Sequence, residues 1–251
     1  MNRPRKEKYI MAIDSGNTRV KWKAELVSGG EIRNFVALND LVGIKKLWAD
    51  LRRPDICLVS NVAGPRLKKT LLSNCFDLWG IEPIFIKSQR TCCGVTNNYN
   101  DPHSLGTDRW AALIGAHDLG LGDSLVITLG TASTVDVLYS DGGFMGGIIF
   151  PGLDLMMSSL SQKTFALPNS EGGVFNFPRK TDDAIFTGVI RATAGAIDAM
   201  RCQVISDRGM SPKLVISGGN AKKIATYCSG NRVVRDNLVI DGLLRIGRCV
   251  K

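Results

Sequence analysis

The chain begins with a pattern of apolar and polar positions that predicts a strand, a turn and a second strand. Residues 9–13 are apolar throughout, which is typical of a buried strand. Residues 14–18 are polar and contain a glycine, so they predict a tight turn. Over residues 20–26 every second position is apolar, which predicts a strand with one buried face, closed by a turn at Gly29 and Gly30. The apolar positions on that face are Val20, Trp22, Ala24 and Leu26.

The same scheme returns in the second half of the chain. Residues 125–127 predict a strand, residues 130–134 predict a turn, and residues 135–139 alternate as the second strand did. A glycine-containing turn at 141–143 then leads into a predicted strand at 145–149. One supersecondary unit therefore occurs twice, which predicts a fold of two related lobes.

The spacing of the turn glycines supports this repeat. Gly16 and Gly130 lie 114 residues apart, and Gly29 and Gly142 of the following turns lie 113 residues apart. Glycine at such a bend lets backbone N–H groups point into one small volume, which attracts anions. A single glycine hairpin is more often an ordinary β-hairpin. The matched pair favours two halves of a phosphate clamp, facing each other across a cleft.

The segment between the two repeats predicts helices that alternate with strands. Its apolar positions predict helices at 41–51 and 65–76 and strands at 56–60 and 83–86. Such alternation indicates an α/β fold with parallel strands, in which ligands bind at the carboxyl ends of the strands. Residues 60–63 occupy one of these ends, so we expect them to line the cleft.

A polar segment at 97–110 precedes an amphipathic helix predicted at 110–119. Asp108 falls near the first turn of this helix, where a carboxylate stabilises the helix dipole by ~0.3–1 kcal/mol. The same carboxylate can act as a general base beside Arg109, whose guanidinium can hold a substrate carboxylate through two hydrogen bonds. The residues alone leave both interpretations open.

Length and composition agree with a two-lobed globular protein. The chain of 251 residues accommodates two lobes, which we place at 1–115 and 116–251. No stretch approaches the ~18 apolar residues of a membrane span, and the basic residues 1–8 lack the apolar core of a signal peptide. The seven cysteines have no zinc-like spacing, so we interpret them as free thiols of a cytoplasmic protein. The net charge of +9 is compatible with anionic ligands, but the aromatic interleaving typical of nucleic-acid binding is missing.

A series of short motifs in the chain resembles that of the type III pantothenate kinases. Residues 14–21 fit DxGNTxxK, residues 106–109 fit GxDR, and residues 130–136 fit GTAxTxD. The later matches are 146–152 to GGxIxPG, 180–188 to NTxxAIxxG, 217–220 to a Gly-Gly turn on the adenosine side, and 236–243 to a C-terminal block. Each motif is modest alone, but together they span nearly the whole chain in the family's order.

This resemblance implies an α/β, actin-like ATPase fold of the acetate kinase, sugar kinase and Hsp70 superfamily. The first lobe then carries the first phosphate hairpin, and the second lobe carries the second hairpin and the adenosine turn. The implied activity is ATP-dependent phosphorylation of pantothenate to 4'-phosphopantothenate, the first step of coenzyme A biosynthesis, with Mg²⁺ as a cofactor. The family also implies a homodimer with its substrate site near the interface.

The resemblance assigns roles residue by residue. It implies that Asp14 binds Mg²⁺, directly or indirectly. It also implies that Asp108 accepts the proton of the substrate's primary hydroxyl. Thr181 is expected to reach the pantothenate site from the other subunit. The expected ATP and phosphate contacts are Asp14, Ser15, Gly16, Asn17, Thr18, Arg19, Val20, Lys21, Thr131, Gly218 and Gly219. The expected pantothenate contacts are Tyr99, Gly106, Thr107, Asp108, Arg109 and Thr181.

The chain departs from the family pattern at one position. Many relatives carry an aspartate two residues before the glycine of GTAxT, where it binds a monovalent cation such as K⁺ or NH₄⁺. This chain has Thr128 there, and a neutral hydroxyl is a weaker cation ligand than a carboxylate. The substitution predicts a weakened cation dependence, a different ligand, or loss of catalysis.

Two other functions remain open at the level of sequence. One is a non-catalytic member of the family that binds pantothenate or ATP in an accessory or regulatory role, although Asp14, Asp108 and Arg109 are all present. The other is an actin-like enzyme that acts on a different hydroxylated or carboxylated metabolite. Residues 165–177 contain glycines and a proline and predict a loop, serving either as a lid or at the interface.

Overall fold

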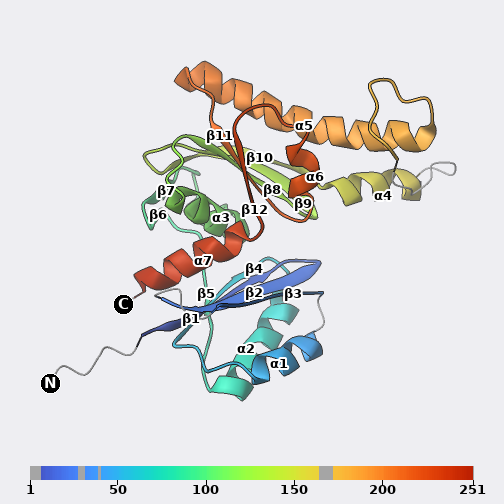
Figure 1. Ribbon diagram of the computed structural model, residues 1–251. Helices are drawn as coiled ribbons and strands as arrows, with labels where there is room; N and C mark the ends of the chain where they lie inside the picture. The colour runs from blue at the N-terminus through green and yellow to red at the C-terminus, as the bar shows by residue number, and fades with distance from the viewer. Residues whose placement is uncertain (1–6, 28–31, 39–40, 164–171, 251) are drawn as a thin grey trace. The chain divides into compact units, whose positions relative to one another are not determined.

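The computed structural model describes residues 7–27, 32–38, 41–163 and 172–250. Two compact units divide the chain, and Figure 1 shows the elements of each. The first unit comprises residues 1–119 and 238–251, and the second comprises residues 120–237. Three features expected from the sequence lie wholly or partly outside the described residues: the basic start at 1–6, the turn at Gly29 and Gly30, and the loop at 165–171.

The sheet of the first unit contains five strands in the order β3-β2-β1-β4-β5. Strands β1 and β2 form an antiparallel hairpin, and β3 continues it, whereas β4 pairs with β1 in parallel and β5 pairs with β4 in parallel. Their bounds are Tyr9–Ser15, Arg19–Leu26, Ile32–Leu38, Ile56–Asn61 and Ile84–Phe85 for β1 to β5. The alternation predicted for β2 is confirmed, because Val20, Trp22 and Ala24 are all buried.

Helices cover both faces of this sheet. Figure 1 shows α1 (Leu41–Ala49) and α2 (Pro65–Trp79) together on one face and α7 (Leu238–Cys249) on the other. On the first face, Trp48 packs edge-on against Trp22 and stacks on Trp79, with ring centroids 6.4 Å and 5.7 Å apart. The burial of apolar surface from helices and sheet in one cluster stabilises this layer.

Helix α3 (Thr107–Asp118) packs against α7, which explains why the end of the chain belongs to the first unit. A side chain at Gly242 would collide with the carbonyl oxygen of Ala111, and one at Gly115 would crowd that of Leu238. The two backbones therefore lie in contact at these glycines. The division predicted from the sequence placed residues 116–119 and 238–251 in the second lobe, whereas the structure groups them with the first unit.

Strands of the second unit repeat the arrangement of the first, in the order β10-β9-β8-β11-β12. Strands β8 and β9 form an antiparallel hairpin that β10 continues, while β11 and β12 extend the sheet in parallel. Their bounds are Ser124–Leu129, Ala132–Leu138, Gly143–Pro151, Lys213–Ser217 and Arg232–Arg235 for β8 to β12. The matching strand orders confirm the internal repeat predicted from the sequence.

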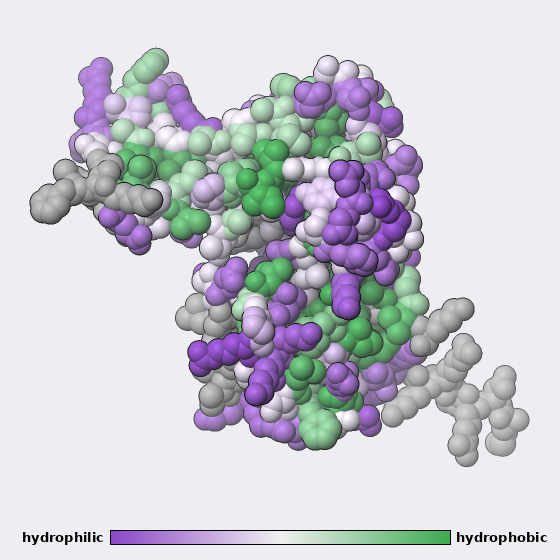
Figure 2. Space-filling view, turned by 180° about the vertical axis from the view of Figure 1, so that it is seen from behind, coloured by the Kyte–Doolittle hydropathy of each residue, from purple (hydrophilic) through white to green (hydrophobic). Residues whose placement is uncertain are grey.

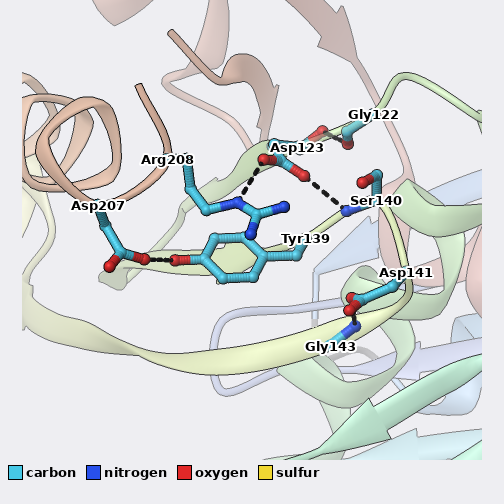
Figure 3. Close-up of polar contacts among 9 residues, drawn as sticks. Gly122, Asp123, Tyr139, Ser140, Asp141, Gly143, Asp207 and Arg208 are labelled. Atoms are coloured by element: carbon cyan, nitrogen blue, oxygen red, sulfur yellow. Dashed lines mark hydrogen bonds and ion pairs between the residues drawn. The ribbon is translucent and has the colours of Figure 1, made fainter. Parts of the chain in front are cut away.

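The helices of the second unit are α4 (Leu153–Lys163), α5 (Thr181–Arg208) and α6 (Ala221–Ala225). Figure 3 shows how polar contacts fasten the end of α5 to the sheet. The guanidinium of Arg208 lies over the ring of Tyr139, and its Nε is 3.1 Å from the carboxylate of Asp123. The hydroxyl of Tyr139 donates to Asp207, so two neighbouring side chains of α5 hold the end of the β9 strand.

Further short elements of the first unit follow β5 in the chain. A hairpin of β6 (Thr91–Cys92) and β7 (Val95–Asn97) is followed by a 3-10 turn at Pro102–Ser104 and then by α3. The helix and strand predictions at 41–51, 56–60, 65–76 and 83–86 are each confirmed by a matching element, although Leu47 of the first is exposed. Among the residues that the structure describes, none of the helices meets the length and apolarity of a membrane span.

Candidate active site

The first predicted phosphate turn joins β1 to β2. Asp14 is the penultimate residue of β1, opposite Lys21 of β2 and beside Ser60 of β4 in the sheet register. The N–H of Gly16 donates to the carbonyl oxygen of Arg19 at 3.1 Å and closes the turn. Residues 17–19 are exposed, so solvent reaches this turn.

The carboxyl group of Asp14 is a weaker acid than an ordinary aspartate. Its burial raises its pKa from 3.8 to about 6, against the opposing effect of the Lys21 ammonium. The neighbouring carboxylate of Asp108 raises the pKa further. Two residues predicted to be functional from distant motifs are therefore brought together within one unit.

Asp108 lies in the first turn of α3, as the sequence predicted. Its Oδ1 accepts a hydrogen bond from the backbone N–H of Arg109 at 2.8 Å, which fixes the carboxylate over the helix N-terminus. A Cβ at Gly106 would lie only 2.7 Å from that oxygen, so glycine is needed for this conformation of Asp108. The hydroxyls of Thr107 and Ser60 are 3.0 Å apart and attach the start of α3 to the end of β4.

Arg109 is buried, and its guanidinium faces Tyr99. Its Nη1 donates to the Tyr99 hydroxyl at 3.1 Å, and its Cζ lies 5.7 Å from the centre of the tyrosine ring. The guanidinium of Arg90 donates to the carbonyl oxygens of Asn97 and Tyr99, which fixes the segment that carries the tyrosine. A cation and a phenol held side by side have the chemistry to bind a carboxylate.

A cavity of about 380 Å³ lies next to this group and is lined by Lys87, Ser88, His103 and Thr107. The hydroxyl of Ser88 is buried and has no hydrogen-bond partner in the part of the chain that the structure describes. His103 Nδ1 lies 2.8 Å from the Ser88 carbonyl oxygen. Sequence reasoning missed Lys87 and Ser88, because nothing in the stretch after β5 marks these residues as functional.

In the second unit, the hairpin between β8 and β9 carries Gly130 and Thr131. Gly152 lies directly behind it: its N–H donates to the Thr131 carbonyl oxygen at 2.9 Å, and a Cβ at Gly152 would overlap the Gly130 carbonyl. Gly218 has a φ of 104° and packs equally closely on the Leu129 carbonyl. The structure therefore brings together the second phosphate turn and the predicted adenosine turn, Gly218 and Gly219.

Thr128 lies on β8, two residues before the hairpin glycine. Its partners in the sheet register are Thr134 on β9 and Ser217 on β11. The buried hydroxyl of Thr134 has no hydrogen-bond partner among the described residues. Three hydroxyl side chains thus occupy adjoining positions, Thr128, Thr134 and Ser217. By the resemblance above, many family members have a carboxylate at the first of these positions.

Comparison with known proteins decides the family. The family model of type III pantothenate kinase matches residues 10–203 of the chain. The chain belongs to this family. A type III pantothenate kinase of Nitrosospira multiformis is 42% identical over 240 residues, which cover 95% of this chain and 91% of the relative.

Solved structures agree on the fold. A Campylobacter jejuni protein described as a Baf family transcriptional activator is 22% identical, with a TM-score of 0.60 over 95% of this chain and 97% of its own. A Sinorhizobium meliloti protein described as a 2-dehydro-3-deoxygalactonokinase reaches 0.60 at 14% identity, over 96% of this chain and 98% of its own. The chain has the actin-like ATPase fold that the motifs implied. Membership of a pantothenate kinase family makes it a kinase that uses ATP, typically with a divalent metal ion.

The residues predicted for the site are divided between the two units. The first unit holds Asp14, Lys21, Tyr99, Asp108 and Arg109, and the second holds Thr131, Gly218, Gly219 and Thr181. No group of three His, Cys, Asp or Glu side chains that could bind a metal is present among the described residues. Mg²⁺ needs no such cage, because it is commonly held by one or two carboxylates and the substrate phosphates. Asp14 is a fitting carboxylate, since its high pKa reflects a buried charge that a cation would compensate.

Proposed function

We propose that this protein transfers the γ-phosphoryl group of ATP to the primary hydroxyl of pantothenate, forming 4'-phosphopantothenate and ADP. This reaction is the first step of coenzyme A biosynthesis. The observation that carries the proposal is the proximity of the Asp14 and Asp108 carboxylates, with the cation of Lys21 opposite Asp14. Phosphoryl transfer requires one group to organise the phosphates and another to remove a proton, and these residues supply both.

On the ATP side, the backbone of the first hairpin cradles the phosphates. The backbone N–H groups of the exposed residues 17–19 act as neutral donors, and Lys21 adds positive charge beside Asp14. Ser15 is buried and its hydroxyl donates to Asn61, so it supports the turn. Asp14 binds Mg²⁺ directly or through water, and the bound ion supplies neutralisation of the charge that spreads over the phosphate oxygens. Thr131 contacts ATP from the second hairpin, and Gly218 and Gly219 provide the flat turn on the adenosine side.

On the pantothenate side, Asp108 is the general base. It accepts the hydroxyl proton as the oxygen attacks phosphorus, and its hydrogen bond from the Arg109 N–H keeps the carboxylate in place. The guanidinium of Arg109 and the hydroxyl of Tyr99 bind the pantothenate carboxylate. Gly106 and Thr107 complete the pocket, and the adjoining cavity offers room for the rest of the substrate.

The monovalent cation site is weak in this protein. The positions around Thr128 offer hydroxyl oxygens and lack the family's carboxylate, so K⁺ or NH₄⁺ gains little electrostatic stabilisation there. Asp14, Asp108 and Arg109, the residues assigned to catalysis and substrate binding, are all retained in this chain. We therefore propose retained catalysis with a reduced dependence on the cation.

The protein acts as a homodimer in which Thr181 completes the partner's pantothenate site. Thr181 is exposed at the start of α5. Figure 2 shows apolar atoms gathered over α4 and the start of α5. The exposed apolar side chains there are Leu155, Leu160, Phe175 and Phe177. Such a patch is typical of a surface that another protein covers.

The proposed location of the protein is the cytoplasm. Its seven free thiols fit this reducing compartment.

The test is ATP consumption by the full chain at saturating Mg²⁺, with and without pantothenate. Pantothenate-dependent turnover, together with 4'-phosphopantothenate in the product, supports the kinase. Binding of either ligand without turnover at any K⁺ or NH₄⁺ concentration supports instead the accessory role that the sequence left open. Turnover with other carboxylated alcohols in preference to pantothenate would assign a different substrate to the same site.

A further inference from the structure

Three thiols meet at one end of the first unit. The β6–β7 hairpin carries Cys92 at the end of β6 and Cys93 in its turn, and Cys249 is the last residue of α7. The Sγ atoms of Cys93 and Cys249 are 3.4 Å apart, although 156 residues separate them in the chain. The Sγ atoms of Cys92 and Cys93 are 3.6 Å apart. Figure 1 shows the hairpin and the C-terminal end of α7 in the same region.

The surroundings of these thiols differ in a way that assigns them separate roles. Cys249 is exposed, and its sulfur accepts a hydrogen bond from Arg245 Nη1 at 3.0 Å. Arg245 is itself held by Asp118, whose carboxylate lies 2.8 Å from the guanidinium Nε. The Arg245 guanidinium places a positive charge beside this sulfur, and the thiolate is the reactive form of cysteine. Burial raises the pKa of Cys93, so that thiol keeps its proton at neutral pH.

We propose that Cys249 and Cys93 are a thiol modification site that forms a reversible disulfide when the protein meets a peroxide. The Cys249 thiolate attacks hydrogen peroxide, breaks its O–O bond and becomes a sulfenic acid, releasing hydroxide. The Cys93 thiol then attacks this sulfur, and its proton leaves with the sulfenic oxygen as water. Both sulfurs are oxidised, the peroxide is reduced, and the S–S bond joins the hairpin to α7.

The geometry favours this pair over its competitors. Sulfur atoms in contact need only a small side-chain movement to reach the bonded distance of about 2.05 Å. A bond between Cys92 and Cys93 would close a small ring that strains the intervening planar peptide. Cys57 and Cys75 also hydrogen-bond each other, but both are buried in the core, where a peroxide has no access. Cys202 is exposed but lies in the second unit.

The bond has a structural consequence for the substrate segment. The β6–β7 hairpin leads directly into residues 97–109, which carry Tyr99 and Arg109, and α7 packs along α3, which carries Asp108. A disulfide between Cys93 and Cys249 would fix both neighbours of that segment to each other. Disulfides of intracellular proteins are usually transient and redox-sensing, which fits a bond formed at an exposed thiol.

The experiment treats the reduced full chain with hydrogen peroxide, blocks the remaining thiols and maps the peptides without reduction. We expect a linked peptide pair through Cys93 and Cys249, lighter by two hydrogen atoms, and free thiols in denaturant falling from seven to five. Dithiothreitol should separate the linked peptides and return the number of free thiols to seven. Cys249→Ser should abolish the link, whereas Cys202→Ser should preserve it. Arg245→Gln should slow its formation several-fold, because it removes the positive charge beside the attacking sulfur.

Other outcomes overturn the proposal. A Cys249 that is oxidised beyond the sulfenic acid while Cys93 stays free would show that the two thiols do not join. A link through Cys92, or preferential oxidation of Cys202, would show that the hydrogen bond from Arg245 does not select the reactive thiol. Circular dichroism of each serine variant checks that the fold is retained, so that a missing link reports chemistry.

Discussion

The carboxylate of Asp108, at the start of α3, lies close enough to that of Asp14, at the end of β1, to raise the pKa of Asp14. Two carboxylates in proximity repel each other, so the fold accepts an electrostatic cost at this point. Such a cost is usual where function requires charge, and cations or substrate phosphates reduce it on binding. The relationship therefore predicts effects on stability as well as on turnover.

Replacing Asp14 with asparagine should stabilise the protein at neutral pH while abolishing turnover. The pKa of about 6 in the folded protein lies above the ordinary 3.8, so the folded state binds this proton more tightly than the unfolded state. The free energy of unfolding of the wild type therefore falls as pH rises from about 4 to about 6. The asparagine side chain does not titrate, so the variant should gain roughly 3 kcal/mol well above pH 6 and nothing below pH 4. Urea unfolding without Mg²⁺ at a series of pH values measures this.

The control for that prediction is Asp50→Asn, since Asp50 is an exposed aspartate of the same unit. Its stability should follow the wild type across the pH range. A variant at Asp14 whose stability stays parallel to the wild type from pH 4 to 8 would show that Asp14 is ordinarily solvated, and would contradict the electrostatic argument.

Asp108→Asn should lower kcat by 10² or more and leave the KM for pantothenate nearly unchanged. Asparagine keeps the size of the side chain and can still accept the hydrogen bond from the Arg109 N–H, but it cannot take up a proton. Steady-state kinetics with varied pantothenate measure both constants. Asp118→Asn, at the other end of the same helix, is the matched control and should keep normal kcat. Near-normal turnover of the Asp108 variant would remove this residue from the mechanism.

Much of the first unit follows from the sequence, because its signals are local. The alternation in β2, the polar turn after β1 and the position of Asp108 in the first helical turn all depend on neighbours within a few residues. The return of α7 to the first unit does not follow from local sequence signals, because it depends on the close contact of Gly242 with Ala111. No periodicity within α7 identifies α3 as its partner.

The difference between local signals and contacts of distant segments also applies to the site. Motif order predicted Asp14, Asp108 and Arg109, whereas the hydroxyl pair of Ser60 and Thr107 arises from two elements far apart in the chain. The buried Ser88 hydroxyl, lining a cavity with His103, follows from the path of the backbone after β5. Sequence reasoning identified the residues that carry strong chemistry. The neutral side chains beside them were identified only from the structure.

Tyr99→Phe should raise the KM for pantothenate about tenfold with a small change in kcat. The variant loses the hydroxyl that accepts from Arg109 Nη1, and a hydrogen bond to a charged group contributes roughly 1.5–3 kcal/mol. Arg109→Lys should raise the KM further, because an ammonium cannot bind a carboxylate through two parallel bonds. Tyr227→Phe, at an exposed site in the second unit, serves as the control. An unchanged KM in both site variants would place the pantothenate carboxylate elsewhere.

Turnover should respond weakly to monovalent cations, and Thr128→Asp should increase that response. The wild type offers neutral hydroxyls at Thr128, Thr134 and Ser217, so replacing K⁺ with Na⁺ should change kcat by less than about threefold by this comparison of ligand charge. The variant adds a carboxylate to the same strand position and should gain a saturable K⁺ dependence. Thr226→Asp, at an exposed site, is the control. A strong K⁺ requirement of the wild type would show that another ligand replaces the family's aspartate.

Gly152→Ala should raise the KM for ATP at least tenfold while leaving that for pantothenate nearly unchanged, because the added methyl group displaces the second phosphate hairpin. Its Cβ would overlap the Gly130 carbonyl and lie 2.6 Å from that of Thr131, and these backbone atoms can yield only if the turn moves. A shift of about 1 Å in a positioning element can cost 10²-fold in rate. Gly195→Ala, on an exposed face of α5 with no atom within 4 Å, should keep normal kinetics. An unaltered KM for ATP in a folded Gly152 variant would show that this hairpin does not contact the nucleotide.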